Sequence, residues 1–181
     1  MSIHLILGGA RSGKSSYAER QARQHLASTP GGRLHYVATA IAFDDEMRER
    51  IVHHQQQRGG DWQEHEAPTQ LAQTLAEMQA GDVVLVDCLT LWLNNVIYND
   101  GQTMNATQIR QQVEQLAQSL ARTQATVLLV SNEVGMGVVP MGEVSRLFVD
   151  HAGWMNQAIA AVADSVVLVA AGLPLTLKSS S

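Results

Sequence analysis

The eight residues GGARSGKS, Gly8 to Ser15, restrict the possible folds of this chain more than any other stretch. The apolar run IHLIL at residues 3–7 precedes them and is typical of a buried parallel strand, and residues 14–27 have a helical composition. A strand that leads through G-x-x-x-x-G-K-S into a helix is the arrangement of a phosphate-binding loop, or P-loop. The alternative is a glycine-rich turn that matches by chance, and the flanking strand and helix argue against it.

The chemistry of a phosphate-binding loop explains this spacing. Gly8 and Gly13 allow the backbone to turn its N–H groups toward phosphate oxygens, and the helix N-terminus adds partial positive charge. Lys14 is placed to reach the β- and γ-phosphates, and the Ser15 hydroxyl can ligate Mg²⁺. The chain contains only one other lysine, Lys178. We therefore expect this loop to bind a nucleoside triphosphate together with Mg²⁺.

Apolar runs and helix-like segments alternate along the rest of the chain, which predicts an α/β fold with a mostly parallel sheet flanked by helices. No linker or internal repeat interrupts the pattern, so we expect one nucleotide-binding domain over residues 1–181. Loops are expected at 99–105 and 132–144. The strands predicted after the first are 33–40, 61–66, 82–87, 126–131, 166–172 and an edge strand at 173–178. The helices predicted after the first are 44–58, 69–80, 89–99, 105–123 and 145–165.

Composition excludes several classes of function. The formal net charge is −5 and there is no basic tract, so we expect no nucleic acid or anionic membrane as partner. No stretch approaches the roughly 18 apolar residues of a membrane span, and the N-terminal MSIHLILGGA lacks the basic region of a signal peptide. Cys88 is the single cysteine, which rules out an internal disulfide and fits a reducing compartment. We expect a cytoplasmic protein.

Asp87 is the candidate second ligand for the metal. It ends the apolar run VVLVD, and ligands of parallel sheets bind at the carboxyl ends of the strands. An acid at this place can hold Mg²⁺ in the manner of a Walker B aspartate. The alternative is that Asp87 caps the helix that begins in DCLT.

Two adjacent histidines lie in the helix predicted over 44–58. At 100° per residue, Arg50 and Arg58 each lie about 40° from His54 on opposite sides, so the three form a ladder at i, i+4 and i+8. His53 points elsewhere, over Glu49, and a surface ion pair is its expected role.

Two guanidinium groups beside one imidazole favour a neutral, nucleophilic ring and offer donors to a phosphate. Such a histidine can attack a nucleoside triphosphate at the α-phosphorus, form a phosphoramidate and release pyrophosphate. The competing interpretation is an ordinary histidine on a solvated helix face. A metal site is not expected, because adjacent histidines on a helix point apart.

Several strings together resemble a known family over nearly the whole chain. They are GGARSGKS, YVATA, DDEMRERIVHHQQQR, LVDCLTLWLNN, VSNEVGMGVVP, RLFVDHAGWMNQAIAAVAD and VVLVAAGLPLTLK. They resemble the bifunctional adenosylcobinamide kinase / adenosylcobinamide-phosphate guanylyltransferase of cobalamin biosynthesis. The histidine helix and NEVGMGVVP are more specific to it than the P-loop.

The resemblance implies a RecA-like P-loop NTPase sheet, two reactions and a homotrimer. The family phosphorylates adenosylcobinamide with ATP or GTP, then transfers GMP from GTP through a histidine to give adenosylcobinamide-GDP. Its pattern R-I-x-x-H-x-x-x-R places that histidine at His54, with His53 as the alternative. The nucleotide contacts it implies are Gly8, Gly9, Ala10, Arg11, Ser12, Gly13, Lys14, Ser15, Thr39, Ala40, Gln55, Gln56, Gln57, Arg58, Glu66 and Asp87, with Ser15 and Asp87 at the metal.

Two other functions compete with this interpretation. A simple P-loop kinase for a small molecule would need Lys14, Ser15 and Asp87 but not His54. A nucleotide-regulated binding module would bind GTP without releasing pyrophosphate. Asn132 and Glu133 either contact substrate or shape their loop. Trp62, Trp92 and Trp154 are expected in the core or an interface. The polar residues Arg146, Asp150, Asn156 and Gln157 are expected on one face of the last helix. That face is either solvated or in contact with another subunit, and the trimer implied by the resemblance favours the contact.

Overall fold

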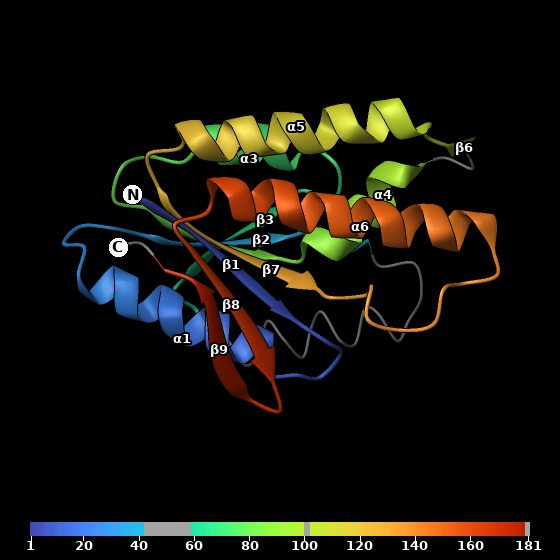
Figure 1. The fold of residues 1–181 in the computed structure, drawn as a ribbon. Coiled ribbons are helices and arrows are strands. Elements are labelled where there is room, and N and C mark those ends of the chain that lie inside the picture. Colours follow the sequence, from blue (N-terminus) through green and yellow to red (C-terminus); the bar gives the residue numbers. More distant parts are fainter. Residues whose placement is uncertain (42–58, 100–101, 180–181) are drawn as a thin grey trace.

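A seven-stranded sheet forms the centre of the molecule (Figure 1). The computed structural model describes residues 1–41, 59–99 and 102–179. The strand order is β3-β2-β4-β7-β1-β8-β9, and all neighbours are parallel except the last pair, β8 and β9. The strands are β1 (Ser2–Gly8), β2 (Leu34–Ala38), β3 (Trp62–Glu66), β4 (Val83–Asp87), β7 (Thr126–Asn132), β8 (Ser165–Ala170) and β9 (Leu173–Lys178).

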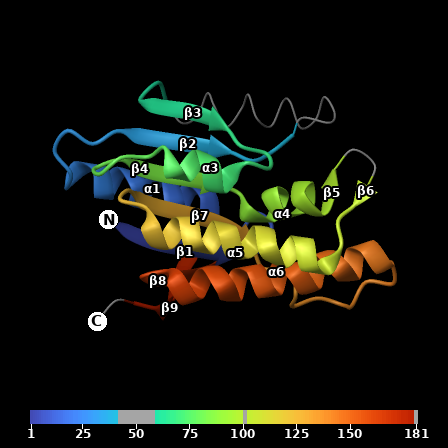
Figure 2. The same ribbon diagram turned by 90° about the horizontal axis from the view of Figure 1, so that it is seen from above.

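Helices cover both faces of this sheet. Helix α1 lies on one face, and the other helices described lie on the opposite face, as Figure 2 shows from above. The alternation of side chains along β1 divides the core in the same way, because Leu5 and Leu7 pack toward one hydrophobic cluster and Ile6 toward the other. The helices are α1 (Lys14–Ala27), α3 (Leu71–Ala76), α4 (Leu89–Ile97), α5 (Ala106–Arg122) and α6 (Glu143–Val162).

The predicted α/β architecture and the predicted strands are confirmed, including the edge strand at the C-terminal end. The helix predicted over 69–80 is shorter, Leu71–Ala76, because Asp82 accepts a hydrogen bond from the Gln79 amide (2.9 Å) and Gly81 turns the chain with φ 92°. The helix predicted over 44–58 lies outside the described residues.

The loop expected at 99–105 contains a small antiparallel ribbon. Strand β5 (Tyr98–Asn99) pairs with β6 (Gln102–Thr103). A strand of two residues is too short for alternation to reveal it.

The long helix α6 corrects one expectation about its polar face. Asn156 is buried, and its side-chain oxygen accepts a hydrogen bond from the Ser131 hydroxyl at 2.8 Å. It therefore joins α6 to β7 within the chain, and is neither on a solvated face nor on one that meets another subunit. Trp62 and Trp92 lie in the core as expected, whereas Trp154 is 45% exposed.

Candidate active site

The P-loop connects β1 directly to α1. Gly13 has φ 93°, a left-handed conformation that favours glycine, and a Cβ on it would lie 3.2 Å from the Cα of Gly172. A Cβ on Gly8 would lie 2.7 Å from the Val169 carbonyl oxygen, which leaves no room for a side chain. The Gly172 amide also donates to the Ser12 carbonyl at 2.8 Å. The turn between β8 and β9 therefore supports the loop from outside.

The N-terminus of α1 is open to an anion. Its N-cap is Gly13, which provides no side-chain cap, and its first turn contains no acidic residue. The first N–H groups of such a helix have no intrahelical partner and attract negative charge. The Ser12 hydroxyl is buried in the same loop without a hydrogen-bond partner. Arg11 adds a left-handed residue with φ 55°, a strained conformation of the kind that clusters at ligand sites.

Lys14 begins α1 and lies over the loop. Its ammonium group donates a hydrogen bond to the Gly9 carbonyl oxygen at 3.1 Å. Gly9, Ala10 and Arg11 are exposed, whereas Lys14 and Ser15 are half-buried at the base of the loop. The loop therefore combines the Lys14 ammonium group with the Ser15 hydroxyl and the N-terminal N–H groups of α1.

Asp87 ends β4 on the same edge of the sheet as the P-loop. It pairs with Val130 of β7, and Val130 pairs with Ile6 of β1. Two strand spacings of about 4.8 Å separate β4 from β1, so the backbones lie about 10 Å apart. The carboxylate is half-buried. Asp87 and the P-loop therefore follow the carboxyl ends of strands on the same side of the sheet.

Thr39 fixes the backbone that follows Asp87. It is fully buried, and its hydroxyl donates to the Cys88 carbonyl (2.7 Å) and accepts from the Cys88 amide (2.9 Å). Its own carbonyl accepts from the side chain of Asn95 at 2.8 Å, and Asn95 also donates to Pro68. In this structure Thr39 therefore holds the backbone of Cys88, directly after β4.

Asn95 is a site residue that the sequence analysis missed. It is buried and joins α4 to the segments after β2 and β3. The string LWLNN contained it, but nothing in that string shows which amide turns inward.

Glu66 ends β3 at the same level as Asp87. Both pair with Ala38, one on each side of β2, so the two carboxylates flank the end of that strand. Glu66 is exposed and Ala40 is half-buried. The Ala67 amide donates to the Ala38 carbonyl at 2.8 Å, which holds the two strand ends together.

Asn132 and Glu133 lie next to the P-loop at the end of β7. Asn132 pairs with Gly8, and the Glu133 amide donates to the Gly8 carbonyl oxygen at 3.2 Å. The Glu133 carboxylate accepts from the Gly135 amide at 2.8 Å, which is a loop-shaping role. The Asn132 side-chain oxygen is buried without a hydrogen-bond partner. Glu133 therefore shapes the loop, and Asn132 lies beside the P-loop with its side-chain oxygen unpaired.

Cys88 is not a nucleophile. Burial, together with the neighbouring charge of Asp87, raises the pKa of its thiol to about 11. The thiol is therefore neutral near pH 7, and the reactive form of cysteine is the thiolate.

The oxygen ligands present fit Mg²⁺. Among residues 1–41, 59–99 and 102–179, no cluster of three or more His, Cys, Asp or Glu side chains could hold a metal by itself. Mg²⁺ commonly takes one or two protein ligands and completes its shell with phosphate oxygens and water. The Ser15 hydroxyl and the Asp87 carboxylate are ligands of that kind.

The residues of the histidine helix lie outside the described part of the chain. They are Arg50, His53, His54, Gln55, Gln56, Gln57 and Arg58. The structure therefore places the P-loop, Thr39, Ala40, Glu66 and Asp87 at one sheet edge and leaves the histidine ladder as a sequence prediction.

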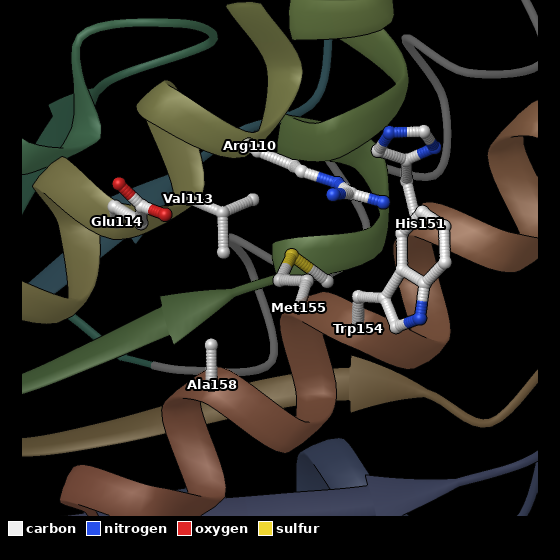
Figure 3. Close-up of a pocket in the computed structure, with 7 residues that line it drawn as sticks. All are labelled: Arg110, Val113, Glu114, His151, Trp154, Met155 and Ala158. Carbon is white, nitrogen blue, oxygen red and sulfur yellow. The ribbon is translucent and has the colours of Figure 1, made fainter. Parts of the chain in front are cut away.

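A separate hollow of about 360 Å³ lies between α5 and α6, on the face of the sheet opposite α1 (Figure 3). The Arg110 guanidinium lies 4.4 Å from the centre of the Trp154 ring, and His151 packs edge-on against the same ring. None of the nucleotide contacts predicted from the sequence lines this hollow.

No helix in the described ranges has both the length and the apolar character needed to cross a bilayer.

The sequence matches known proteins over nearly the full length of the chain. A family model described as cobinamide kinase / cobinamide phosphate guanyltransferase matches residues 4–177. The bifunctional adenosylcobalamin biosynthesis protein CobP of Pseudomonas aeruginosa is 48% identical over 176 residues, which cover 96% of this chain and 96% of that protein. The bifunctional adenosylcobalamin biosynthesis protein CobU of Escherichia coli is 36% identical over 185 residues, which cover 96% of this chain and 98% of that protein.

A solved structure supports the fold independently. The flagellar accessory protein FlaH of Methanocaldococcus jannaschii superposes with a TM-score of 0.53 at 15% identity, covering 99% of this chain and 79% of that one. The seven-stranded, mostly parallel sheet with a phosphate loop after β1 is that of a P-loop NTPase.

Proposed function

Because this chain belongs to the cobinamide kinase / cobinamide phosphate guanyltransferase family, we propose how its residues divide the two reactions. It is a bifunctional enzyme of adenosylcobalamin biosynthesis that phosphorylates cobinamide and then transfers a guanylyl group onto the phosphate. The assignment of residues rests on one observation. The P-loop, Asp87 and Glu66 all lie at the carboxyl ends of parallel strands, on the same side of one sheet.

The P-loop carries the kinase reaction. Lys14 and the first amides of α1 hold the β- and γ-phosphates of ATP or GTP, and Ser12 adds a buried hydroxyl. The acceptor hydroxyl oxygen bonds to the γ-phosphorus, the bond from that phosphorus to the bridging oxygen breaks, and the nucleoside diphosphate leaves. The hydroxyl proton is released to solvent. Ser15 and Asp87 would hold Mg²⁺, which when bound neutralises charge on the phosphates.

His54 carries the guanylyl transfer. A ring nitrogen bonds to the α-phosphorus of GTP, the bond between the α-phosphorus and the bridging oxygen breaks, and pyrophosphate leaves. An oxygen of cobinamide phosphate then bonds to the same phosphorus, the P–N bond breaks, and the neutral histidine is restored. Arg50 and Arg58, four residues to either side of His54 in the sequence, stabilise the phosphate charge.

The remaining predicted contacts have separate roles. Thr39 positions the backbone after Asp87 through its two bonds to Cys88. Ala40 follows β2 and Glu66 ends β3, and we assign both to contacts with the nucleoside. Gln55, Gln56 and Gln57 follow the histidine and contact the GTP that it attacks.

The assembly we propose is a cytoplasmic homotrimer, as the resemblance to the family implies. Light scattering on the purified protein measures its mass directly, and one chain has a mass of 19.6 kDa.

A product analysis tests the function. The protein is incubated with adenosylcobinamide, Mg²⁺ and either ATP alone or ATP with GTP, and the corrinoid products are identified by mass spectrometry. We expect the phosphate with ATP alone, and the GDP derivative with pyrophosphate when GTP is added. A phosphate product that is never converted in the presence of GTP would indicate a simple kinase. Binding of GTP without any corrinoid product would indicate a nucleotide-regulated binding module.

A further inference from the structure

The segment after β7 exposes large apolar side chains in close succession. Residues 134–144, which we call the apolar loop, run from the end of β7 into the start of α6. Its exposed side chains are Met136 (80%), Val138 (96%), Val139 (73%), Met141 (96%) and Val144 (52%). Single exposed apolar residues are common, but a contiguous group of them marks a surface that binds something.

Side chains at both ends hold the backbone of the apolar loop. Val134 packs against the core, and the Glu133 carboxylate accepts a hydrogen bond from the Gly135 amide at 2.8 Å. At the other end, the Arg146 guanidinium donates to the carbonyl oxygens of Pro140 (3.2 Å) and Met141. The backbone is therefore tied down at both ends while the apolar side chains point outward.

The apolar loop begins beside the P-loop. Asn132, at the end of β7, pairs with Gly8, and the Glu133 amide donates to the Gly8 carbonyl oxygen at 3.2 Å. The arrowheads of β1 and β7 point the same way in Figure 1, so both loops leave the same edge of the sheet. A large molecule that rests on the apolar loop can therefore extend to the P-loop, where the loop begins.

The kinase reaction needs such a neighbour. The acceptor oxygen must lie about 3–3.5 Å from the phosphorus that it attacks. In cobinamide this oxygen is at the end of a short side chain, and the rest of the molecule is a large macrocycle whose rim carries methyl groups and neutral amides. The bulk of the acceptor must therefore lie on protein surface that adjoins the P-loop.

We propose that the apolar loop is the docking surface for the corrin macrocycle of the acceptor, an assignment that rests on the proposed kinase and guanylyl-transfer function. Glu143 is the one charged residue of the apolar loop, and the stretch 134–142 before it carries none, which suits a methylated macrocycle and does not suit a nucleotide. Met136 and Met141 have flexible, polarisable thioethers that adapt to an irregular surface. Contact with the macrocycle buries these side chains and orients the hydroxyl toward the P-loop.

The test compares two exposed apolar surfaces on one molecule. The double variant Met136→Ser/Met141→Ser removes apolar area from the loop, and Leu177→Ser removes a comparable exposed side chain from β9. Because burying one large apolar side chain is worth about a factor of ten or more in affinity, we expect the KM for cobinamide to rise at least about tenfold in the double variant. Its ATP and GTP affinities and its kcat should stay at the wild-type level, and Leu177→Ser should leave every one of these values unchanged.

Other outcomes would overturn the proposal. An unchanged KM for cobinamide in the double variant would show that the macrocycle docks elsewhere. A change of the mass measured by light scattering in that variant alone would assign the loop to a contact between copies of the chain. If wild-type protein forms no cobinamide phosphate, the proposed function fails, and equilibrium dialysis with cobinamide then tests the loop separately. Weaker corrinoid binding by the double variant than by Leu177→Ser would still support it, and equal binding would reject it.

Discussion

Lys14 is the side chain on which nucleotide binding should depend most at the scale of single residues. Its ammonium group lies over the P-loop and donates to the Gly9 carbonyl oxygen. A charged hydrogen bond contributes about 1.5–3 kcal/mol, so Lys14→Met should weaken GTP and ATP binding by about ten- to a hundredfold. Isothermal titration calorimetry measures both affinities.

Lys178 provides the matched control, because it is the only other lysine. Its ammonium group donates to the Ala160 (2.9 Å) and Ala161 carbonyl oxygens near the C-terminal end of α6. Lys178→Met should lower thermal stability slightly and leave nucleotide affinity unchanged. Equal nucleotide affinities in wild type and Lys14→Met would contradict the role of the P-loop.

Substitutions at Thr39 test whether its hydroxyl acts by holding the backbone of Cys88. Thr39→Val keeps the shape of the side chain but leaves the buried Cys88 amide without its acceptor. A buried unsatisfied group costs about 1–3 kcal/mol, so the free energy of unfolding should fall by that amount. Urea denaturation measures it. Thr39→Ser restores the hydroxyl and should recover most of the loss, whereas similar losses in both variants would indicate that the methyl group matters instead.

The residues of the site differ in how far sequence could predict them. Gly8–Ser15 and Asp87 follow from local strings, because strand, loop and helix are contiguous there. The bonds of Thr39 to Cys88 join residues 49 positions apart, and those of Asn95 join three segments, so no local pattern contains them. The resemblance to a family pointed to Thr39, but only the structure shows its bonds.

At the scale of elements, α5 depends on its N-terminal cap. The Asn105 side chain accepts from the Gln108 amide at 3.0 Å, and the Gln108 side chain accepts from the Asn105 amide at 3.3 Å. Such a capping box contributes about 1 kcal/mol, so Asn105→Ala should lower the Tm by about 2–4 °C in a chain of this size. Calorimetry measures the shift. Asn94→Ala, at an exposed position of α4, is the control, and an equal shift there would remove the capping explanation.

The predicted strands and helices match the structure where tertiary contacts agree with local sequence patterns. The apolar runs became buried strands because both faces of the sheet are covered. The helix predicted from residue 69 ends early because the Asp82 carboxylate accepts a hydrogen bond from the Gln79 amide and Gly81 turns the backbone. Both features are local to residues 79–82, and amphipathic periodicity over 69–80 reports only which side chains are apolar, so it could not show them.

At the scale of the whole molecule, the histidines make stability depend on pH. Burial is the largest cause that lowers the pKa of His4 to about 4, and burial also lowers the pKa values of His25 and His35. Each of these rings therefore binds a proton less readily in the folded protein than in the unfolded chain, which takes up protons below about pH 6.5. The stabilisation is therefore complete above that pH and is lost as pH falls toward 4.

Urea titrations between pH 8 and pH 4 check this dependence. Each histidine contributes at most about 1.4 kcal/mol per pH unit to the slope. His4→Gln removes one titrating group and should flatten the slope between about pH 6.5 and 4. A free energy of unfolding that is higher at pH 5 than at pH 8 would contradict the lowered pKa values of these histidines.

The whole sheet, more than any single motif, brings the candidate site residues together. Residues 8–15, 39–40, 66 and 87 are distant in sequence and meet at one edge because β1, β2, β3, β4 and β7 are parallel. The remaining claim is that His54, between Arg50 and Arg58, forms a covalent bond to GMP. That claim separates a bifunctional transferase from a kinase.

Intact mass spectrometry after incubation with GTP and Mg²⁺ tests it most directly, on wild type, His53→Ala and His54→Ala. We predict an acid-labile, base-stable adduct of the mass of a guanylyl group in wild type and His53→Ala, and none in His54→Ala. Loss of the adduct only in His53→Ala would move the nucleophile by one residue. Wild-type protein that phosphorylates cobinamide and never carries an adduct would contradict the account.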